Sequence, residues 1–330
     1  KLAAILEKTH ARSLLASCFP ARGIVGLNYH RIGDGSRSEL DRGLWSASAE
    51  AFDRQLAWLK SNSDVISPFD IDAARKDRRG RFVLITFDDG YLDNYEFAFA
   101  ALREHGLPAT FFIATGFIDD PRLSWWDEIA SLVRRSSVDV ITMPRWLPYP
   151  QTLVVGERER VVRSLLGIYK SLPTEDAPQF MADLRVAARA APLANGEELW
   201  MNWDMLREMS AAGMTIGGHT VNHIVLSGAS AEQQWQEISV CASRIEAEIG
   251  KKMEYFAYPV GNRSSFNAES MECLERLGVR YAFSYYGVFA DSQAHRYDMP
   301  RMAIEPYVDR DWFRAIVELP RLFCRADASS

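Results

Sequence analysis

The sequence predicts an α/β fold whose simplest closed arrangement is a distorted or incomplete (β/α) barrel. Short apolar runs alternate with segments that carry an apolar stripe at helical spacing. Several of the runs are almost wholly apolar, as in parallel strands that are covered on both faces. Such alternation is typical of parallel βα units, and the 330 residues leave room for an insertion beyond a barrel of about 200–250 residues.

Each expected strand is a short β-branched or aromatic run. The runs cover residues 24–29, 64–67, 82–87, 109–113, 214–217, 255–258 and 281–285. One expected helix carries Phe52, Leu56 and Leu59 on its apolar stripe. Another begins at a capping box that opens with Ser230, and a short third helix ends before Gly278. Strands and helices therefore alternate through most of the chain.

The expected organisation is one domain with an addition at its start and one in its middle. Residues 1–23 are expected to form an amphipathic helix that packs on the domain or lies on a membrane surface. Residues 24–330 form the barrel domain. Within it, about 119–202 break the βα rhythm, with one helix from Trp125 and another near 158–172, and are interpreted as a helical insertion.

Composition excludes several classes of protein. The net charge of −6 gives no electrostatic footprint for nucleic acid, and no apolar run approaches the roughly 20 residues that span a bilayer. The four cysteines are too scattered for a disulfide framework, and Cys241 and Cys273 are expected to be buried thiols. We expect a cytoplasmic or membrane-peripheral protein, or a periplasmic one if a leader has been removed. Nothing in the sequence indicates an oligomeric state.

Two polar motifs follow two of the expected strands. Residues 84–90 read LITFDDG, so that Asp88 and Asp89 come directly after an apolar strand. Residues 214–223 read MTIGGHTVNH, which places His219 and His223 at the spacing used for zinc ligation. An isolated DDG is usually a turn, and an isolated pair of histidines is usually a surface feature. Together at strand ends, where α/β folds collect ligands, they predict one shared site.

A third motif is the turn after the strand at 255–258. The turn contains Pro259, Val260 and Gly261. It is either a plain turn or a turn whose exposed N–H faces the site as an oxyanion donor.

These three motifs, in this order, resemble the polysaccharide deacetylase (NodB-homology) family of carbohydrate esterases. The run WWDE at 125–128 is similar to a bacterial subgroup of envelope and exopolysaccharide deacetylases. The resemblance implies a barrel of the NodB-homology type and a metal-dependent hydrolase that removes N-acetyl groups from N-acetylated sugars of a polysaccharide or glycan precursor, releasing acetate. The alternatives are an O-acetyl esterase, an aminosugar deformylase, or a non-catalytic carbohydrate-binding homologue.

The resemblance also implies roles for the motif residues. Asp88 would be the general base, and Asp89, His219 and His223 would bind one divalent metal ion. Zinc suits this ligand set, and cobalt or nickel could support the same chemistry. The backbone N–H of Val260 would stabilise the oxyanion.

The chain departs from the family pattern in two places. The position that usually holds an arginine is Ala257, and the late segment 299–304 lacks the usual histidine. We expect His30 to be the general acid, because a permuted subgroup of the family supplies the acid from an N-terminal Tyr-His, and Arg301 to replace the missing arginine. The remaining candidates for contact with the substrate or support of the site are Tyr29, Trp126, Asp127, Tyr258 and Pro259.

Overall fold

The computed structural model describes Leu15 and residues 23–77, 80–154, 156–191, 196–287, 289–290 and 293–323. The helix expected over residues 1–23 falls outside this part of the chain, apart from Leu15 and Gly23. In the described ranges, no helix combines the length and the apolarity that crossing a membrane requires.

Six parallel strands form the body of a nine-stranded sheet and lie side by side in chain order. They are β1 (Gly23–Tyr29), β5 (Arg81–Phe87), β6 (Thr110–Ile113), β9 (Thr215–Gly218), β10 (Tyr255–Ala257) and β11 (Tyr281–Phe283). Short strands complete the sheet: β4 (Asp64–Val65) pairs with β5, while β12 (Phe289–Ala290) and β13 (Met302–Ala303) pair with β1. Each of the seven expected runs overlaps one of these strands, with boundaries that differ by one or two residues.

The sheet curls until the segment 299–303 joins its two ends. Met299 bridges to Phe283 on β11, and Met302 pairs with Leu27 on β1. The close approach depends on Gly26, because a Cβ there would lie 2.7 Å from the carbonyl oxygen of Pro300. The expected distorted (β/α) barrel is therefore confirmed.

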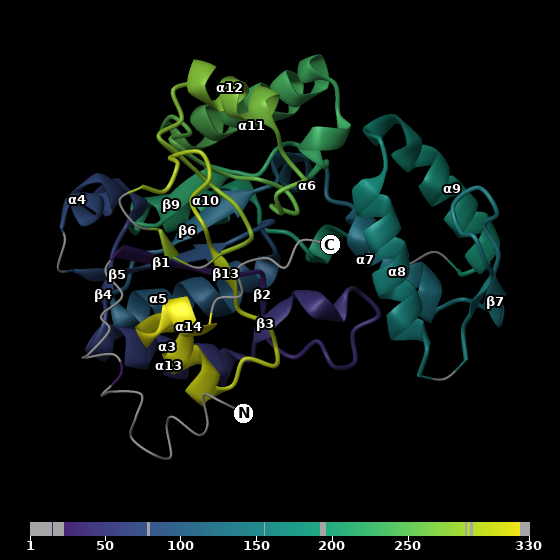
Figure 1. The fold of residues 1–330 in the computed structure, drawn as a ribbon, viewed down its shortest axis with the longest axis horizontal. Coiled ribbons are helices and arrows are strands. Elements are labelled where there is room, and N and C mark those ends of the chain that lie inside the picture. The colour runs from purple at the N-terminus through teal and green to yellow at the C-terminus, as the bar shows by residue number, and fades with distance from the viewer. Residues whose placement is uncertain are drawn as a thin grey trace.

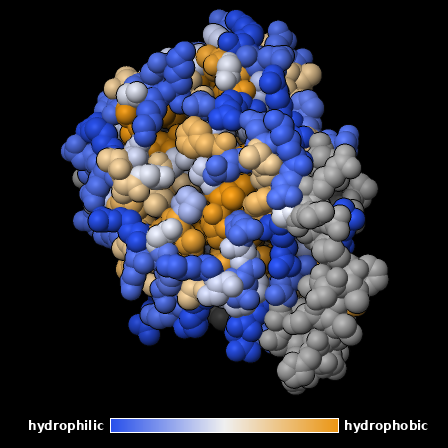
Figure 2. All heavy atoms as spheres, turned by 90° about the vertical axis from the view of Figure 1, so that its left-hand side faces the viewer, coloured by the Kyte–Doolittle hydropathy of each residue, from blue (hydrophilic) through white to orange (hydrophobic). Residues whose placement is uncertain are grey.

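Alternate residues of the strands separate an inner core from an outer core. On β1, Ile24 belongs to the cluster inside the barrel, whereas Val25 and Leu27 pack on the helices outside. Leu84 on β5 likewise lies inside, together with Ile71 of α4 (Ile71–Lys76). Figure 2 shows the side of the molecule that carries α4, where hydrophobic residues gather in the centre of a mostly hydrophilic face.

Helices surround the curled sheet (Figure 1). They are α3 (Ala49–Asn62), α5 (Ala100–His105), α6 (Thr115–Asp119), α10 (Trp203–Ala211), α11 (Ala231–Ile249), α12 (Ala268–Arg276), α13 (Arg310–Glu318) and α14 (Pro320–Phe323), with a π-helical turn at Asn94–Phe99. The capping box expected at Ser230 opens α11, where the Ser230 hydroxyl accepts from the N–H of Gln233. Cys241 and Cys273 are free and buried, as expected.

Between β6 and β9 the chain forms a group of elements that lies to one side of the sheet, at the right of Figure 1. We call it the helical lobe: α7 (Trp125–Arg134), β7 (Val140–Ile141), β8 (Gln151–Thr152), α8 (Arg158–Ser171) and α9 (Ala177–Ala188). On the barrel side, the small strands β2 (Arg31–Ile32) and β3 (Trp45–Ala47) follow β1. The buried side chains of the lobe belong to the same cluster as the outer core of the barrel.

Candidate active site

The loops that follow β5, β9 and β10 contain an unusual backbone conformation. Five described non-glycine residues have positive φ, and only one of them, Arg189 at the end of α9, lies away from these loops. The other four are Asp89 (77°), Thr220 (66°), His223 (53°) and Val260 (63°). Left-handed backbone is unfavourable for residues with a Cβ and persists where the surrounding structure imposes it, typically at functional sites.

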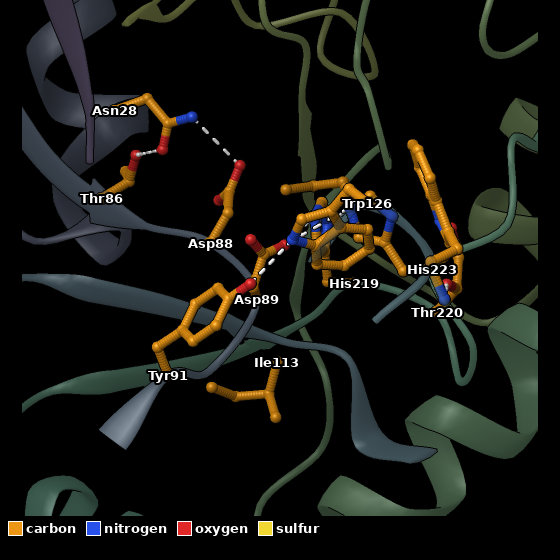
Figure 3. A network of polar contacts seen from close by, with 12 residues as sticks. Asn28, Thr86, Asp88, Asp89, Tyr91, Ile113, Trp126, His219, Thr220 and His223 are labelled. Carbon is orange, nitrogen blue, oxygen red and sulfur yellow. Dashed lines mark hydrogen bonds and ion pairs between the residues drawn. The ribbon is translucent and has the colours of Figure 1, made fainter. Parts of the chain in front are cut away.

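Asp89, His219 and His223 converge at the centre of these loops (Figure 3). Asp89 Oδ1 lies 3.5 Å from Nε2 of His219 and 3.3 Å from Nε2 of His223. The candidate ligand atoms all lie within 4.8 Å of one another, and all three residues are buried. The histidines therefore share with Asp89 the site that the motif spacing predicts.

The unsatisfied atoms of this group fit a bound cation. Asp89 Oδ1 is buried without a hydrogen-bond partner among the described residues, which is rare for a carboxylate. Nδ1 of His219 donates to the carbonyl oxygen of Ala257 at 2.7 Å, which leaves Nε2 as the ring atom on the side of Asp89 and fixes the ring orientation that ligation needs. Burial, reinforced by the charge of His219, lowers the pKa of His223 to about 3, so that this ring is neutral, as ligation requires.

Asp88 is held by a forked contact from Arg301. Nη1 of Arg301 donates to Oδ1 of Asp88 at 2.7 Å, and Nη2 donates to Oδ2 at 2.9 Å. The side-chain amide of Asn28 donates to the same Oδ2 at 3.1 Å. Burial alone would raise the pKa of Asp88, but the charges of Arg301 and His219 outweigh it and hold the pKa well below its ordinary value. Asp88 is therefore a buried, ionised carboxylate.

Arg301 reaches Asp88 from inside the barrel. It lies on the closing segment 299–303 and is fully buried, and it also donates to the carbonyl oxygen of Ser284 and to the hydroxyl of Thr86. The sequence proposes Arg301 as the replacement for the arginine absent at Ala257, and the structure places its guanidinium directly on the carboxylate in question. The guanidinium group of arginine suits this bidentate contact, because it is planar and always charged.

A pocket of about 300 Å³ opens above Asp88 and Asp89. One wall is formed by barrel residues and the other by the helical lobe. The lining residues are His30, Asp41, Gly43, Leu44, Asp88, Asp89, Trp125, Trp126, Arg163, Leu166, Lys170, His219, His223, Tyr258, Val260, Tyr285 and Glu305. Of the residues singled out in the sequence, Tyr29, Arg301, Asp127 and Pro259 do not line the pocket.

His30 lines the pocket with its backbone fixed on both sides. Its N–H donates to the hydroxyl of Ser46 at 3.0 Å, and its carbonyl oxygen accepts from the amide of Asn94 at 2.6 Å. Its ring meets the ring of Tyr285 edge-on at 5.5 Å between centroids. The Tyr285 hydroxyl donates to Glu305 at 3.0 Å, and burial raises the pKa of Glu305. The imidazole thus faces the pocket, which Glu305 also lines.

Tyr29 points away from the site, contrary to the expectation that grouped it with the site residues. Its hydroxyl donates to Gln55 on α3 at 2.8 Å, and its ring stacks on Phe87 in the outer core. Side chains alternate along a strand, so its neighbour Asn28 faces inward and contacts Asp88. Sequence reasoning missed Asn28, although this period of two could have indicated it.

Trp126 and Asp127 belong to one buried network at the base of α7. The Trp126 ring packs against the ring of His223 at 4.3 Å between centroids, and its Nε1 donates to the hydroxyl of Tyr91 at 2.7 Å. Tyr91 in turn donates to Asp127 at 2.6 Å, and the N–H of Asp41 donates to the other oxygen of Asp127 at 2.8 Å. Burial raises the pKa of Asp127 to about 6. Asp127 therefore positions the pocket wall without entering the pocket.

The turn after β10 presents a free backbone donor. The Tyr258 hydroxyl donates to the carbonyl oxygen of Tyr297 at 2.9 Å, and its ring stacks on Phe266 at 3.9 Å between centroids, which anchors the turn from below. Pro259 is buried within the turn. The N–H of Val260 has no hydrogen-bond partner in the described part of the chain, and Val260 lines the pocket.

Comparison with known proteins identifies relatives over most of the chain. Residues 75–143 and 174–282 match the family model described as polysaccharide deacetylase. The putative polysaccharide deacetylase YxkH of Bacillus subtilis (strain 168) is 20% identical over 296 residues, which cover 88% of this chain and 75% of that protein. The poly-beta-1,6-N-acetyl-D-glucosamine N-deacetylase of Escherichia coli O157:H7 is 31% identical over 117 residues, which cover 33% of this chain but 17% of that enzyme.

Solved structures share the fold. The deacetylase PplD of Streptococcus pyogenes, solved in complex with acetate, aligns with a TM-score of 0.59 at 18% identity, covering 88% of this chain and 96% of that one. IcaB of Ammonifex degensii aligns with a TM-score of 0.58 at 20% identity, covering 90% and 97%. At these identities the likeness establishes the fold.

Proposed function

Because this chain belongs to the polysaccharide deacetylase family, we propose that it is a metal-dependent hydrolase that removes N-acetyl groups from the N-acetylated sugars of a polysaccharide or glycan precursor. The observation that carries the proposal is the ionised carboxylate of Asp88 next to the buried group of Asp89, His219 and His223. The E. coli relative, named for poly-beta-1,6-N-acetyl-D-glucosamine, supports an exopolysaccharide as substrate. The compartment stays a prediction from the sequence.

The pocket residues can divide the hydrolysis between them. Asp89, His219 and His223 would hold one divalent ion, for which zinc is our choice, and that ion would supply polarisation of the acyl carbonyl and a lower pKa of the attacking water. Asp88 accepts the proton of that water, since it is ionised and borders the pocket. Arg301 and Asn28 keep the carboxylate oriented toward the reacting atoms.

Two further groups act on the substrate as its C–N bond breaks. The N–H of Val260 donates to the oxygen that becomes negative when water adds to the carbonyl carbon. His30, which lines the pocket, donates a proton to the leaving amine nitrogen. The products are acetate and a free amino sugar, so that every proton taken by Asp88 is balanced by one given to nitrogen or returned to solvent.

The test is acetate release from a panel of substrates, with and without a chelator. We expect N-acetylated oligosaccharides to be hydrolysed, the chelator to abolish turnover, and Asp88→Asn to lower kcat by at least about 10²-fold. A protein that binds metal and sugar, releases no acetate and is unaffected by Asp88→Asn would instead be a non-catalytic binder. O-acetylated and N-formylated sugars in the same panel test the two other hydrolytic activities.

A further inference from the structure

The loop that carries the two candidate histidine ligands has an unfavourable backbone. It follows β9 and runs from His219 to His223, and we call it the histidine loop. Thr220 and His223 both have positive φ, at 66° and 53°, although both have a Cβ. Such backbone persists only where neighbouring contacts impose it, so the histidine loop must be held by residues outside it.

Glu237 on α11 accepts three hydrogen bonds from the histidine loop. Its Oε2 accepts from the N–H of Val221 at 2.9 Å and from the N–H of Asn222 at 2.8 Å. Its Oε1 accepts from the side-chain amide of Asn222 at 2.7 Å. Consecutive N–H groups that point to one anion form a concave binding site, and bonds to an ionised acceptor are stronger than neutral ones. One carboxylate therefore holds the middle of the loop.

The other side of the histidine loop is attached to α6 and to the segment after it. The N–H of Gly116 donates to the carbonyl oxygen of Val221 at 2.8 Å, and a Cβ on Gly116 would lie only 2.7 Å from that oxygen. Nη2 of Arg122 donates to Oδ1 of Asn222 at 2.6 Å. These contacts use acceptors of the loop, whereas Glu237 uses its donors. The loop is therefore held from two sides, with Glu237 as its contact on the side of α11.

His223 depends on this support more than His219 does. Nδ1 of His219 donates to Ala257, which orients its ring directly. Nδ1 of His223 is buried and has no hydrogen-bond partner among the described residues. Histidine ligands are usually oriented by a hydrogen bond of the second ring nitrogen. Since none is found for His223 in the described part of the chain, its ring direction depends on packing against Trp126 and on the backbone of the histidine loop.

Glu237 lies outside the pocket in which hydrolysis is proposed. It lines a separate surface cavity of about 360 Å³, together with Gln233 and Gln236 of the same helix. A change at Glu237 therefore alters neither a candidate metal ligand nor a residue that lines the pocket.

We propose that Glu237 is a positioning residue for the metal site. Its carboxylate holds the histidine loop in the left-handed conformation that directs Nε2 of His223 toward Asp89, 3.3 Å away, so that a divalent ion finds its ligands already arranged. The inference rests on the proposed function for the presence of that ion. It gives α11, which contributes no candidate ligand, an effect on metal affinity.

The test compares zinc affinity after substitutions on α11. Glu237→Ala removes all three hydrogen bonds, and Glu237→Gln keeps an acceptor oxygen but loses the charge. The matched control is Glu246→Ala, because Glu246 is exposed on the same helix and its carboxylate has no hydrogen-bond partner in the described ranges. Competition of the metal-free protein with a chelator gives the zinc Kd, and denaturant unfolding of the same sample reports on the fold.

The three variants should differ in their effect on zinc binding. Glu237→Ala should raise the zinc Kd by about 10–100-fold, as loss of a contact behind a metal ligand typically does. Glu237→Gln should raise it by about fivefold, and Glu246→Ala by less than about twofold. If Glu237→Ala does not fold, Glu237→Gln decides against the same control. An unchanged Kd in the Glu237 variants that fold overturns the proposal, even if acetate is released.

A double-variant cycle separates positioning of His223 from a general structural role. In the His223→Ala background, Glu237→Ala should change the zinc Kd by less than about threefold, because the ligand through which Glu237 acts is gone. Equal effects in both backgrounds would overturn the proposal. Non-additive effects without acetate release from any sugar would uphold Glu237 as a positioning residue and contradict the proposed hydrolysis.

Discussion

Arg301 donates two hydrogen bonds to the carboxylate of Asp88, at 2.7 and 2.9 Å, across 213 residues of sequence. Both side chains are buried, with 0% and 3% exposed. The arginine sits on the segment that closes the barrel, and the aspartate on the strand end that opens into the pocket. The same contact therefore links closure of the fold to the charge and orientation of the candidate base.

Removal of the Arg301 guanidinium should destabilise the protein. We expect Arg301→Met to lower the free energy of unfolding by about 3–5 kcal/mol, because Asp88 would be left without its counter-ion. The double variant Asp88→Asn/Arg301→Met should regain a large part of that loss, since no charge then remains. Denaturant unfolding measures both. A double variant no more stable than Arg301→Met would show that the ion pair is not the cause.

Binding of a metal ion should stabilise the fold through Asp89, His219 and His223. At a free zinc concentration of about one hundred times Kd, linkage predicts a stabilisation of roughly 2.7 kcal/mol, which raises Tm. His219→Ala should abolish the rise. His105→Ala is the control, because His105 pairs with Asp53 on the surface, 2.7 Å away. If His219→Ala responds to zinc like the control, the three residues are not the metal site.

The strands and the first two motifs could be predicted because their signals are local. An apolar run that ends in two carboxylates, or in two histidines four residues apart, is complete within ten residues of sequence. Asn28 and Tyr29 show the limit of this reasoning. They are adjacent, yet Asn28 faces Asp88 and Tyr29 faces the outer core, so that the choice between them depends on which face of β1 lies inward.

The opposite wall of the pocket carries no comparable signal. Arg163 and Lys170 line the pocket because α8 packs over the barrel. Glu305 lines it because the chain turns back after β13. None of these residues belongs to a motif or follows a strand of the parallel body. Their placement results from packing between segments that lie far apart in the sequence, which one sequence does not reveal.

His30 should matter for amides more than for esters. We expect His30→Gln to lower kcat for N-acetylated sugars by about 10²–10⁴-fold, because an amine leaves only after protonation. An O-acetylated sugar has a better leaving group and should lose much less activity. The zinc-dependent rise in Tm should be unchanged, since His30 is not a ligand. Equal losses for both substrates would contradict the role of general acid.

Val260 should tolerate loss of its side chain. At φ of 63° a β-branched residue is strained, and glycine adopts this conformation freely. Val260→Gly keeps the backbone N–H, so kcat should stay within about threefold. Relief of the strain, about 1–3 kcal/mol, should offset the added flexibility of the unfolded chain, and stability should be unchanged or slightly higher. A large loss of kcat with intact stability would assign the function to the valine side chain.

Asp127 should make stability fall as pH rises through the weakly acidic range. Burial raises its pKa from 3.8 to about 6, so the folded protein binds a proton there that the unfolded chain has already released. The free energy of unfolding should therefore drop between pH of about 4 and 6, by about 3 kcal/mol in total, and level off above. The asparagine side chain of Asp127→Asn does not titrate, so the variant should not show this drop.

The measurement is the difference in unfolding free energy between the unaltered protein and Asp127→Asn, because other titrating groups cancel in it. From about pH 4.5 to 7.5 the unfolding free energy of the unaltered protein should fall, relative to that of Asp127→Asn, by roughly 2 kcal/mol. Asp64→Asn, which changes an exposed carboxylate on β4, should give a difference that stays flat. A flat difference for Asp127→Asn, or one that grows in favour of the unaltered protein, would mean that the Tyr91 and Asp41 contacts hold Asp127 ionised in the folded state.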